Sequence, residues 1–252
     1  MNLQLLDPVR ITVVQNSPDV PLDTFTDLLG PGVRLVRPFA GDALPDATDI
    51  GDGLVVLGGE MSAYADDVAP WLPALRDLLS AAVISAVPTL GICLGAQLLA
   101  VAGGGHVQVA APPGREAGLT RVFWKSGAEA DPVLGPLARA AAGTGKRARS
   151  LTVSMHADAI IDLPEDASWL GMSDMYPYQA FRLGSAVGVQ FHPEASLSTL
   201  RAWTDQHADT DTENVLAEAG PFEGEVRETG RLLAQSFLAV VHDDVARRGV
   251  RA

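Results

Sequence analysis

One cysteine of the chain lies in a pattern that favours nucleophilic chemistry. Cys93 is the only cysteine among 252 residues, and Gly91 and Gly95 flank it two residues away on each side. Residues 89–92 predict a short buried strand, and residues 94–100 predict an apolar helix. The glycines permit an abrupt turn between the two elements, which is the nucleophile-elbow arrangement with a thiol in place of the hydroxyl. Because the N-terminus of a helix favours an anion, this position favours the thiolate form.

A lone cysteine is more often a small buried hydrophobic residue, so the elbow interpretation requires a base elsewhere in the chain. His192 is the best candidate for that base. It follows a strand predicted over residues 186–191, and Pro193 and Glu194 come directly after it. A histidine and a carboxylate at this spacing can face one cleft, where the acid holds the imidazole in the useful tautomer.

The other four histidines carry weaker signals. His156 follows a predicted strand and could line a pocket. The remaining three lie in glycine-rich, polar or helical surroundings and are expected to be solvated or structural: His106, His207 and His242. The histidines and the single cysteine are not at metal-ligand spacings, so the sequence predicts no metal site.

A pair of glycines marks a second point where chemistry is expected. Gly58 and Gly59 directly follow residues 54–57, a predicted strand that is apolar throughout. Glycines at the carboxyl end of a central strand lie where open α/β sheets bind ligands, and their N–H groups can point at a developing negative charge. An ordinary Gly-Gly turn is the alternative, but the pairing with the cysteine turn favours the functional interpretation.

The elements that must position these residues predict an α/β fold. A strand that is apolar on both faces, as 54–57 is, belongs in the middle of a parallel sheet. The expected architecture is three-layered, with a mostly parallel central sheet and helices on both faces. Further strands are predicted at 10–14, 33–36, 107–109, 119–123, 150–155, 169–173 and 179–183, helices at 22–29, 71–82, 196–207 and 221–248 with a short one beginning at 131–132, and loops at 110–118 and 143–149.

Composition excludes several classes of function. The hydrophobic fraction of 47% is enough for a sizeable core, and no apolar run is long enough to cross a bilayer. Eighteen basic and 31 acidic residues give a formal charge of −13, which argues against a broad nucleic-acid-binding surface. A single cysteine forms no internal disulfide, and residues 1–8 show no secretory signal, so we expect a cytoplasmic protein.

Two motifs together resemble the class I glutamine amidotransferases of the triad type. They are Gly91-Ile92-Cys93-Leu94-Gly95-Ala96-Gln97 and Val189-Gln190-Phe191-His192-Pro193-Glu194. The stretches 58–62 and 155–158 match other recurring segments of that family in the same order, and 176–181 resembles a segment of its free-standing members. The resemblance covers about residues 10–195, and it implies a flavodoxin-like fold.

The resemblance implies a catalytic triad and its reaction. Cys93 is then the nucleophile, His192 the base and Glu194 the group that orients the base. Cys93 would attack the side-chain amide of glutamine, ammonia would leave, and water would resolve a γ-glutamyl thioester. The family's oxyanion hole corresponds to the backbone amides of Gly59 and Leu94, and no cofactor is expected.

The resemblance also implies contacts to the substrate. Gln97 matches a substrate-contacting glutamine, and the backbone at Met155 and His156 matches the segment that holds the α-amino and α-carboxyl end of glutamine. Gly58 is assigned to the same binding site. One departure is that Ala157 stands where glycine is common, which is expected to alter this pocket slightly.

A second departure concerns the ammonia acceptor. The chain is expected to form a single glutamine amidotransferase-like domain over 1–252, with a catalytic core over about 10–195 and a helical C-terminal extension over 196–252. That extension has room for two or three helices but for no synthase domain. The resemblance implies that the small-molecule substrate is glutamine or a γ-glutamyl compound. The acceptor of ammonia, if one is used, is expected to be a separate subunit.

Two alternatives stay open at this stage. A γ-glutamyl amine or peptide hydrolase would use the same triad with another leaving group. A wide cleft around residues 61–70 and 110–118 would favour it, and a closed pocket sized for glutamine would count against it. A non-catalytic regulatory protein on the same fold is the other alternative, although such proteins normally lose a member of the triad.

Overall fold

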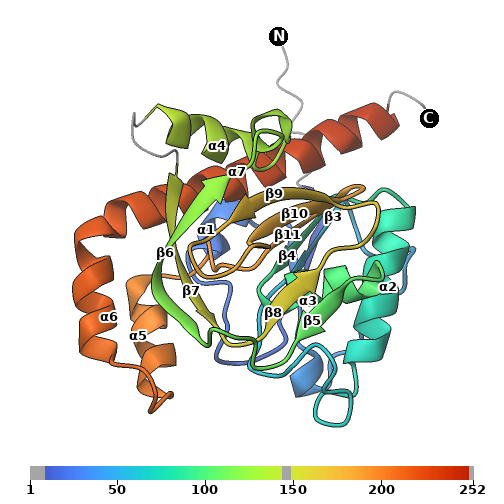
Figure 1. Ribbon diagram of the computed structural model, residues 1–252. Helices are drawn as coiled ribbons and strands as arrows, with labels where there is room; N and C mark the ends of the chain where they lie inside the picture. Colours follow the sequence, from blue (N-terminus) through green and yellow to red (C-terminus); the bar gives the residue numbers. More distant parts are fainter. Residues whose placement is uncertain (1–8, 144–148, 250–252) are drawn as a thin grey trace.

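The fold is built on one large sheet with helices on both sides (Figure 1). The computed structural model describes residues 9–143 and 149–249. Within these residues the main sheet has nine strands, in the order β2-β1-β3-β4-β11-β10-β9-β6-β7, and a small second sheet pairs β5 with β8. The strands are β1 (Ile11–Val14), β2 (Val33–Val36), β3 (Gly53–Val56), β4 (Thr89–Ile92), β5 (His106–Gln108), β6 (Glu116–Trp124), β7 (Arg149–His156), β8 (Ala159–Asp162), β9 (Ser168–Met172), β10 (Ala180–Leu183) and β11 (Ala186–Val189).

The main sheet changes character halfway across. The five neighbours β2, β1, β3, β4 and β11 are all parallel to one another, whereas each of the following pairs, from β11–β10 to β6–β7, is antiparallel. Only β10 and β6 therefore run against the common direction. The predicted α/β fold with a mostly parallel central sheet is confirmed.

Helices cover both faces of the main sheet. They are α1 (Phe25–Leu29), α2 (Leu72–Ile84), α3 (Leu94–Ala102), α4 (Gly135–Ala142), α5 (Leu197–Asp205), α6 (Thr212–Ala219) and α7 (Glu223–Gly249). Leu54 and Val56 of β3 belong to the core that includes α2 and α3, whereas Val55 between them belongs to the core that includes α1, α4 and α7. Alternate residues of this strand thus enter two separate cores, which explains why its sequence is apolar without interruption.

The strand order brings three carboxyl ends together at one edge of the sheet. β4 lies between β3 and β11, with Gly91 opposite Val56 and Ile92 opposite Val189. The glycine pair after β3, the cysteine after β4 and the histidine after β11 consequently leave the sheet side by side. The edge strand β7 also lies next to these three strand ends, since its residue Val153 forms an isolated antiparallel bridge with His192.

The structure corrects several predicted elements. β6 begins at Glu116, inside the predicted loop 110–118, because it pairs with β7 from the Glu116–His156 pair onward. β8 and α6 were not predicted, and the side chain of Asp211 begins α6 by accepting a hydrogen bond from Asn214 N. The helix expected from Asp131 begins later, at the start of α4. Residues 1–8 and most of the predicted loop 143–149 lie outside the described residues.

Candidate active site

Cys93 lies at the turn between β4 and α3, as the sequence predicts. Its φ is 51° and its ψ is −107°, a conformation that costs a non-glycine residue about 1–3 kcal/mol and needs support from its surroundings. The flanking glycines allow that support. A Cβ on Gly95 would lie 2.1 Å from the carbonyl oxygen of Val56, and one on Gly91 would lie 2.6 Å from the carbonyl oxygen of Gly95. A larger residue at Gly95 would push the turn away from β3, and one at Gly91 would push β4 away from the first turn of α3.

His192 and Glu194 follow β11 and form a buried pair. The Nδ1 atom of His192 lies 2.7 Å from Oε1 of Glu194, and the two side chains are only 3% and 1% exposed. His192 and Cys93 line the same hollow, and the backbone N–H of His192 donates to the carbonyl oxygen of Val153 at 2.8 Å. Since Nδ1 faces the carboxylate, Nε2 is the ring nitrogen available to the thiol.

The charges around His192 hold it in its protonated form. Burial alone would lower its pKa, but the negative charge of Glu194, the charge of Cys93 and the hydrogen bonds to both raise the pKa from 6.5 to about 10. Attraction therefore outweighs desolvation. Among the described residues, no donor reaches the second carboxylate oxygen of Glu194, so its charge acts chiefly on the imidazole.

Two helices fix the histidine from behind. The ring of Trp203 in α5 packs on the ring of His192 with 4.5 Å between centroids, and its Nε1 donates to the carbonyl oxygen of Asp19 at 2.7 Å. A Cβ on Gly230 of α7 would lie 2.1 Å from the carbonyl oxygen of Pro193. Helices α5 and α7 therefore help to position His192 after the end of β11.

Gly59 and Leu94, whose backbone amides the sequence assigns to an oxyanion hole, lie near Cys93. Gly59 lines the hollow that contains Cys93, and Leu94 is the first residue of α3. The N–H group of a first helical residue has no partner within its own helix, so it is available to a ligand. Both residues are thus close to the thiol, in the region that the sequence assigned to an oxyanion hole.

Gly58 is confined by the histidine and the cysteine. A Cβ built on it would lie 2.8 Å from Cε1 of His192 and 3.4 Å from Cβ of Cys93. We expect Gly58→Ala to lower the rate of a reaction that uses Cys93 and His192 by about 10²-fold, because small misplacements of reacting groups have effects of that size. Gly127→Ala is the matched control, since its Cβ would meet only Leu170 at 3.8 Å. Equal rates for the two variants would contradict the expected role of this close approach.

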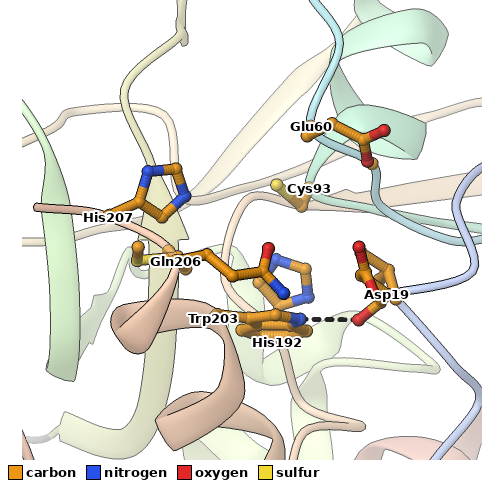
Figure 2. A pocket seen from close by; sticks show the side chains of 10 residues that line it. Asp19, Glu60, Cys93, His192, Trp203, Gln206 and His207 are labelled. Atoms are coloured by element: carbon orange, nitrogen blue, oxygen red, sulfur yellow. Dashed lines mark hydrogen bonds between the residues drawn. The ribbon is translucent and has the colours of Figure 1, made fainter. Parts of the chain in front are cut away.

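Two hollows meet at Cys93. The first, of about 150 Å³, is lined by Asp19, Val20, Gly59, Glu60, Cys93, Met155, His192, Trp203, Gln206 and His207. Figure 2 shows the polar groups of this hollow arranged around the sulfur. The second, of about 180 Å³, is lined by Gly59, Glu60, Met61, Cys93, Gln97, Arg115, Met155, His156, Ala157, Asp158 and His207. The predicted substrate contacts Gln97, Met155 and His156 thus gather around the second hollow.

The side chain of Gln97 is held in place by its neighbours. Its Nε2 donates to the carbonyl oxygen of Asp158 at 2.9 Å and to Oε1 of Gln190 at 3.3 Å. The amide of Gln190 in turn lies 3.7 Å from the sulfur of Cys93. Gln97 therefore belongs to a chain of amides that reaches from the second hollow to the thiol.

The imidazole of His156 is engaged in the protein interior. Its Nε2 lies 3.0 Å from Oε2 of Glu116, which also accepts a hydrogen bond of 2.6 Å from Nε2 of Gln179. Its Nδ1 lies 2.9 Å from the carbonyl oxygen of Asp158, and its ring contacts Tyr176. The ring therefore holds the segment 155–158 in position, which leaves backbone groups of that segment to face a ligand.

Removing the carboxylate of Glu116 tests this buried network. We expect Glu116→Ala to lower the free energy of unfolding by about 3–5 kcal/mol, because it leaves the buried groups of His156 and Gln179 without their acceptor. Glu116→Gln keeps an acceptor oxygen and should cost clearly less. Urea denaturation followed by circular dichroism measures both, and equal losses in the two variants would contradict the network's importance.

Sequence reasoning missed part of the site. His207 was expected to be solvated or structural, but it lines both hollows, and Asp19, Trp203 and Gln206 were not candidates. Asp19 follows the carboxyl end of β1, so the rule that ligands bind at strand ends could have found it. Trp203 in α5 and Gln206 directly after it belong to no recognisable motif. Their position depends on how α5 packs against the sheet.

Two features are absent from the described part of the chain: a group of metal ligands and a membrane-spanning helix. Among residues 9–143 and 149–249, no three His, Cys, Asp or Glu side chains are grouped so that they could hold a metal ion. None of the helices in that part of the chain combines the length and the apolar character needed to cross a membrane. The expectation that the reaction needs no cofactor stays a prediction.

Comparison with known proteins points to one family. Residues 36–205 match the family model described as glutamine amidotransferase class-I. Over 145 residues the chain is 32% identical to GMP synthase [glutamine-hydrolyzing] of Streptococcus equi subsp. zooepidemicus, and that match covers 56% of this chain and 24% of the relative. The chain thus spans about a quarter of the length of this curated relative.

Solved structures share the fold over nearly the whole chain. A glutamine amidotransferase from Thermotoga maritima has a TM-score of 0.77 and 26% identity, with 92% of this chain and 99% of that chain covered. A glutamine amidotransferase from Methylobacillus flagellatus, at 24% identity and a TM-score of 0.77, covers 91% of this chain and 94% of its own, and shows likeness of fold. Because the family model matches more than half of the residues, the chain belongs to the class I glutamine amidotransferase family.

Proposed function

We propose that the chain hydrolyses the side-chain amide of glutamine to glutamate and ammonia through a γ-glutamyl thioester on Cys93. The observation that carries the proposal is the alignment of a strained cysteine, a buried histidine and a buried carboxylate at the ends of β4 and β11. Cysteine nucleophiles elsewhere rely on the same combination of an adjacent base and a group that orients it. Membership of the family agrees with this chemistry.

In the proposed first step, the sulfur of Cys93 attacks the amide carbon of glutamine. The C–N bond breaks, the proton held by His192 passes to the departing nitrogen, and ammonia leaves. A water molecule then attacks the thioester carbon and gives a proton to His192 as the C–S bond breaks. Glutamate leaves, and Cys93 and the protonated His192 are restored for the next cycle.

Glu194 and two backbone amides support this sequence of steps. The carboxylate of Glu194 stabilises the imidazolium and fixes the orientation of the ring. The N–H groups of Gly59 and Leu94 are proposed to bind the oxygen that becomes negative when the sulfur attacks. Loss of one such donor typically costs about 10²–10³-fold in rate.

The glutamyl part of the substrate is assigned to the hollow that contains Gln97. This hollow is lined by both a cation, Arg115, and acidic groups, Glu60 and Asp158. A zwitterionic amino-acid end suits such a lining, and the backbone at Met155 and His156 lies beside it. Gly58 contributes by keeping the space between the substrate and His192 free of a side chain.

A separate acceptor of ammonia is part of the proposal. The curated relatives are named as glutamine-hydrolysing GMP synthases and are about four times as long as the stretch they share with this chain. We propose that the ammonia is passed to an acceptor on a partner subunit, and that this chain acts in the cytoplasm.

Release of glutamate and ammonia from glutamine by the purified chain is the test of this function. Equal amounts of both products are expected, together with labelling of Cys93 by a glutamine-analogue electrophile. Because Cys93 is the only cysteine, any thiol label reports on this position alone. Absence of both turnover and labelling would favour the non-catalytic alternative and would contradict the proposal.

A further inference from the structure

The chemistry of the proposed reaction distinguishes the two hollows at Cys93. This inference rests on the proposed function. When the amide bond breaks, the departing nitrogen must lie within reach of the proton on His192. His192 lines the first hollow, with Trp203 packed on its ring, whereas Gln97 and residues 156–158 line the second. The first hollow is therefore the side from which the amine leaves.

This leaving side has more room than ammonia requires. Its volume is about 150 Å³, whereas one water-sized molecule needs about 10–15 Å³ of such space. Asp19, Glu60 and Gln206 are exposed at its mouth, and Figure 2 shows them on different sides of the sulfur. No residue of the loops 61–70 and 110–118, where a wide cleft would favour a γ-glutamyl hydrolase, lines this first hollow, whereas Met61 and Arg115 line the second.

Beyond the protonated His192 and the thiol at its base, the charged side chains that line the leaving side are acidic. Two carboxylates line it, Asp19 and Glu60, and its described lining includes neither lysine nor arginine. Burial and then the charge of Arg115 lower the pKa of His207 below 6.5, so that its ring is neutral near pH 7. Arg115 itself is paired with Asp209 at 3.2 Å and lines the other hollow.

We propose that the hollow formed by Asp19, Glu60, Trp203 and Gln206 is a subsite for a leaving amine larger than ammonia that carries a second positive charge. The substrates assigned to it are γ-glutamyl amides of diamines and related cationic amines. Asp19 and Glu60 attract the distal ammonium group, and Trp203 forms an apolar floor beside His192 for the carbon chain.

The reaction of such a substrate keeps the steps of glutamine hydrolysis. The sulfur of Cys93 forms a bond to the γ-carbonyl carbon, the bond from that carbon to the amine nitrogen breaks, and the proton of His192 moves to that nitrogen. The free amine departs through the hollow. Water then splits the thioester, so that one water is consumed and one glutamate and one amine are released.

A matched set of substrates isolates the effect of charge. The γ-glutamyl amides of diaminobutane, butylamine and aminobutanoate share a four-carbon chain but end in a cation, a methyl group and an anion. With the full-length chain at low salt, we expect kcat/KM to be about tenfold higher for the cation than for the neutral amide, since partly exposed ion pairs contribute modestly. The anion should be the poorest substrate, and added salt should reduce the preference.

Variants identify the carboxylates responsible. In Asp19→Asn with Glu60→Gln, the ratio between the cationic and neutral amides should fall close to unity. Asp19→Lys should shift the preference toward the anionic amide. Asp67→Asn removes an exposed carboxylate outside both hollows, and it should leave the ratio as in the parent chain.

Glutamine measured in parallel separates this inference from the proposed function. Turnover of glutamine but of none of the three conjugates, equal kcat/KM for all three, or a preference that survives both the double variant and high salt would each overturn the subsite and leave the glutaminase intact. Absence of turnover with glutamine and conjugates alike would overturn both. A cation preference that is lost in the double variant supports the subsite.

Discussion

Replacing Cys93 with alanine is expected to lower kcat for glutamine hydrolysis by on the order of 10⁴-fold or more. The proposed reaction passes through a covalent bond to the sulfur, and no other cysteine is present to replace it. His192 and Glu194 would stay in place but would have no nucleophile to activate. The measurement is glutamate release under saturating glutamine, with enough enzyme to detect the residual rate.

Two observations guard this prediction against a trivial loss of folding. Cys93 is 5% exposed and packs as a small side chain, so alanine removes few contacts. Cys93→Ser keeps the volume and should lose activity to a similar degree, because a hydroxyl is a much weaker nucleophile than a thiolate. A Cys93 variant that folds normally and retains activity within about tenfold of the parent would contradict a reaction through a thioester.

His192→Asn is expected to change the pH dependence of Cys93 alkylation. In the parent chain His192 holds a proton up to about pH 10 and lies beside the sulfur, so that iodoacetamide should react readily even at pH 6. Without the imidazolium, the reaction depends on a thiol that has no neighbouring positive charge to favour its thiolate form. The rate at pH 6 should then fall by on the order of 10²-fold, and the two proteins should converge above pH 9.

The raised pKa of His192 also makes its contribution to stability depend on pH. The pKa of His192 is raised above its unfolded value of 6.5, so its contribution to the free energy of unfolding is fully present below pH 6.5 and is lost as the pH rises through about 10. Since Asn leaves the buried charge of Glu194 without a partner, the double variant with Glu194→Gln serves as the folded reference.

An alkylation rate at pH 6 in His192→Asn equal to that of the parent would contradict the pairing of thiol and imidazole.

The residues with local signatures could be predicted from the sequence. The turn at Cys93 needs small neighbours because Gly95 lies against the backbone of β3, and this requirement is visible as a glycine on each side. The spacing of His192 and Glu194 likewise reflects a direct contact two residues apart. The parallel half of the sheet was predictable because its strands are short, apolar runs separated by glycine and proline.

The parts that depend on tertiary packing were not predictable in this way. β6 contains a charged residue and a glycine with φ of 95° at its start, Glu116 and Gly118, which hides its alternation. The carboxylate of Glu116 is buried where His156 of β7 and Gln179, just before β10, reach it. Nothing local indicates such a contact.

The leaving side of the site shows the same limitation. Trp203 and His207 come from α5 and the residues after it, and they reach Cys93 because α5 packs beside β7 and the loop after β1. A helix of ordinary amphipathic sequence gives no sign of which cavity its end will line. The features that distinguish one member of a family from another therefore became visible only in the fold.

The most direct test of the central claim is to trap the acyl-enzyme. The purified chain is mixed with glutamine, quenched with acid within the first turnover, and examined by mass spectrometry of the intact protein and its peptides. We predict a mass increase of one glutamyl group on the peptide that contains Cys93, absent in Cys93→Ala. Release of glutamate with no adduct at any time, or with an adduct on another residue, would contradict a γ-glutamyl thioester at Cys93.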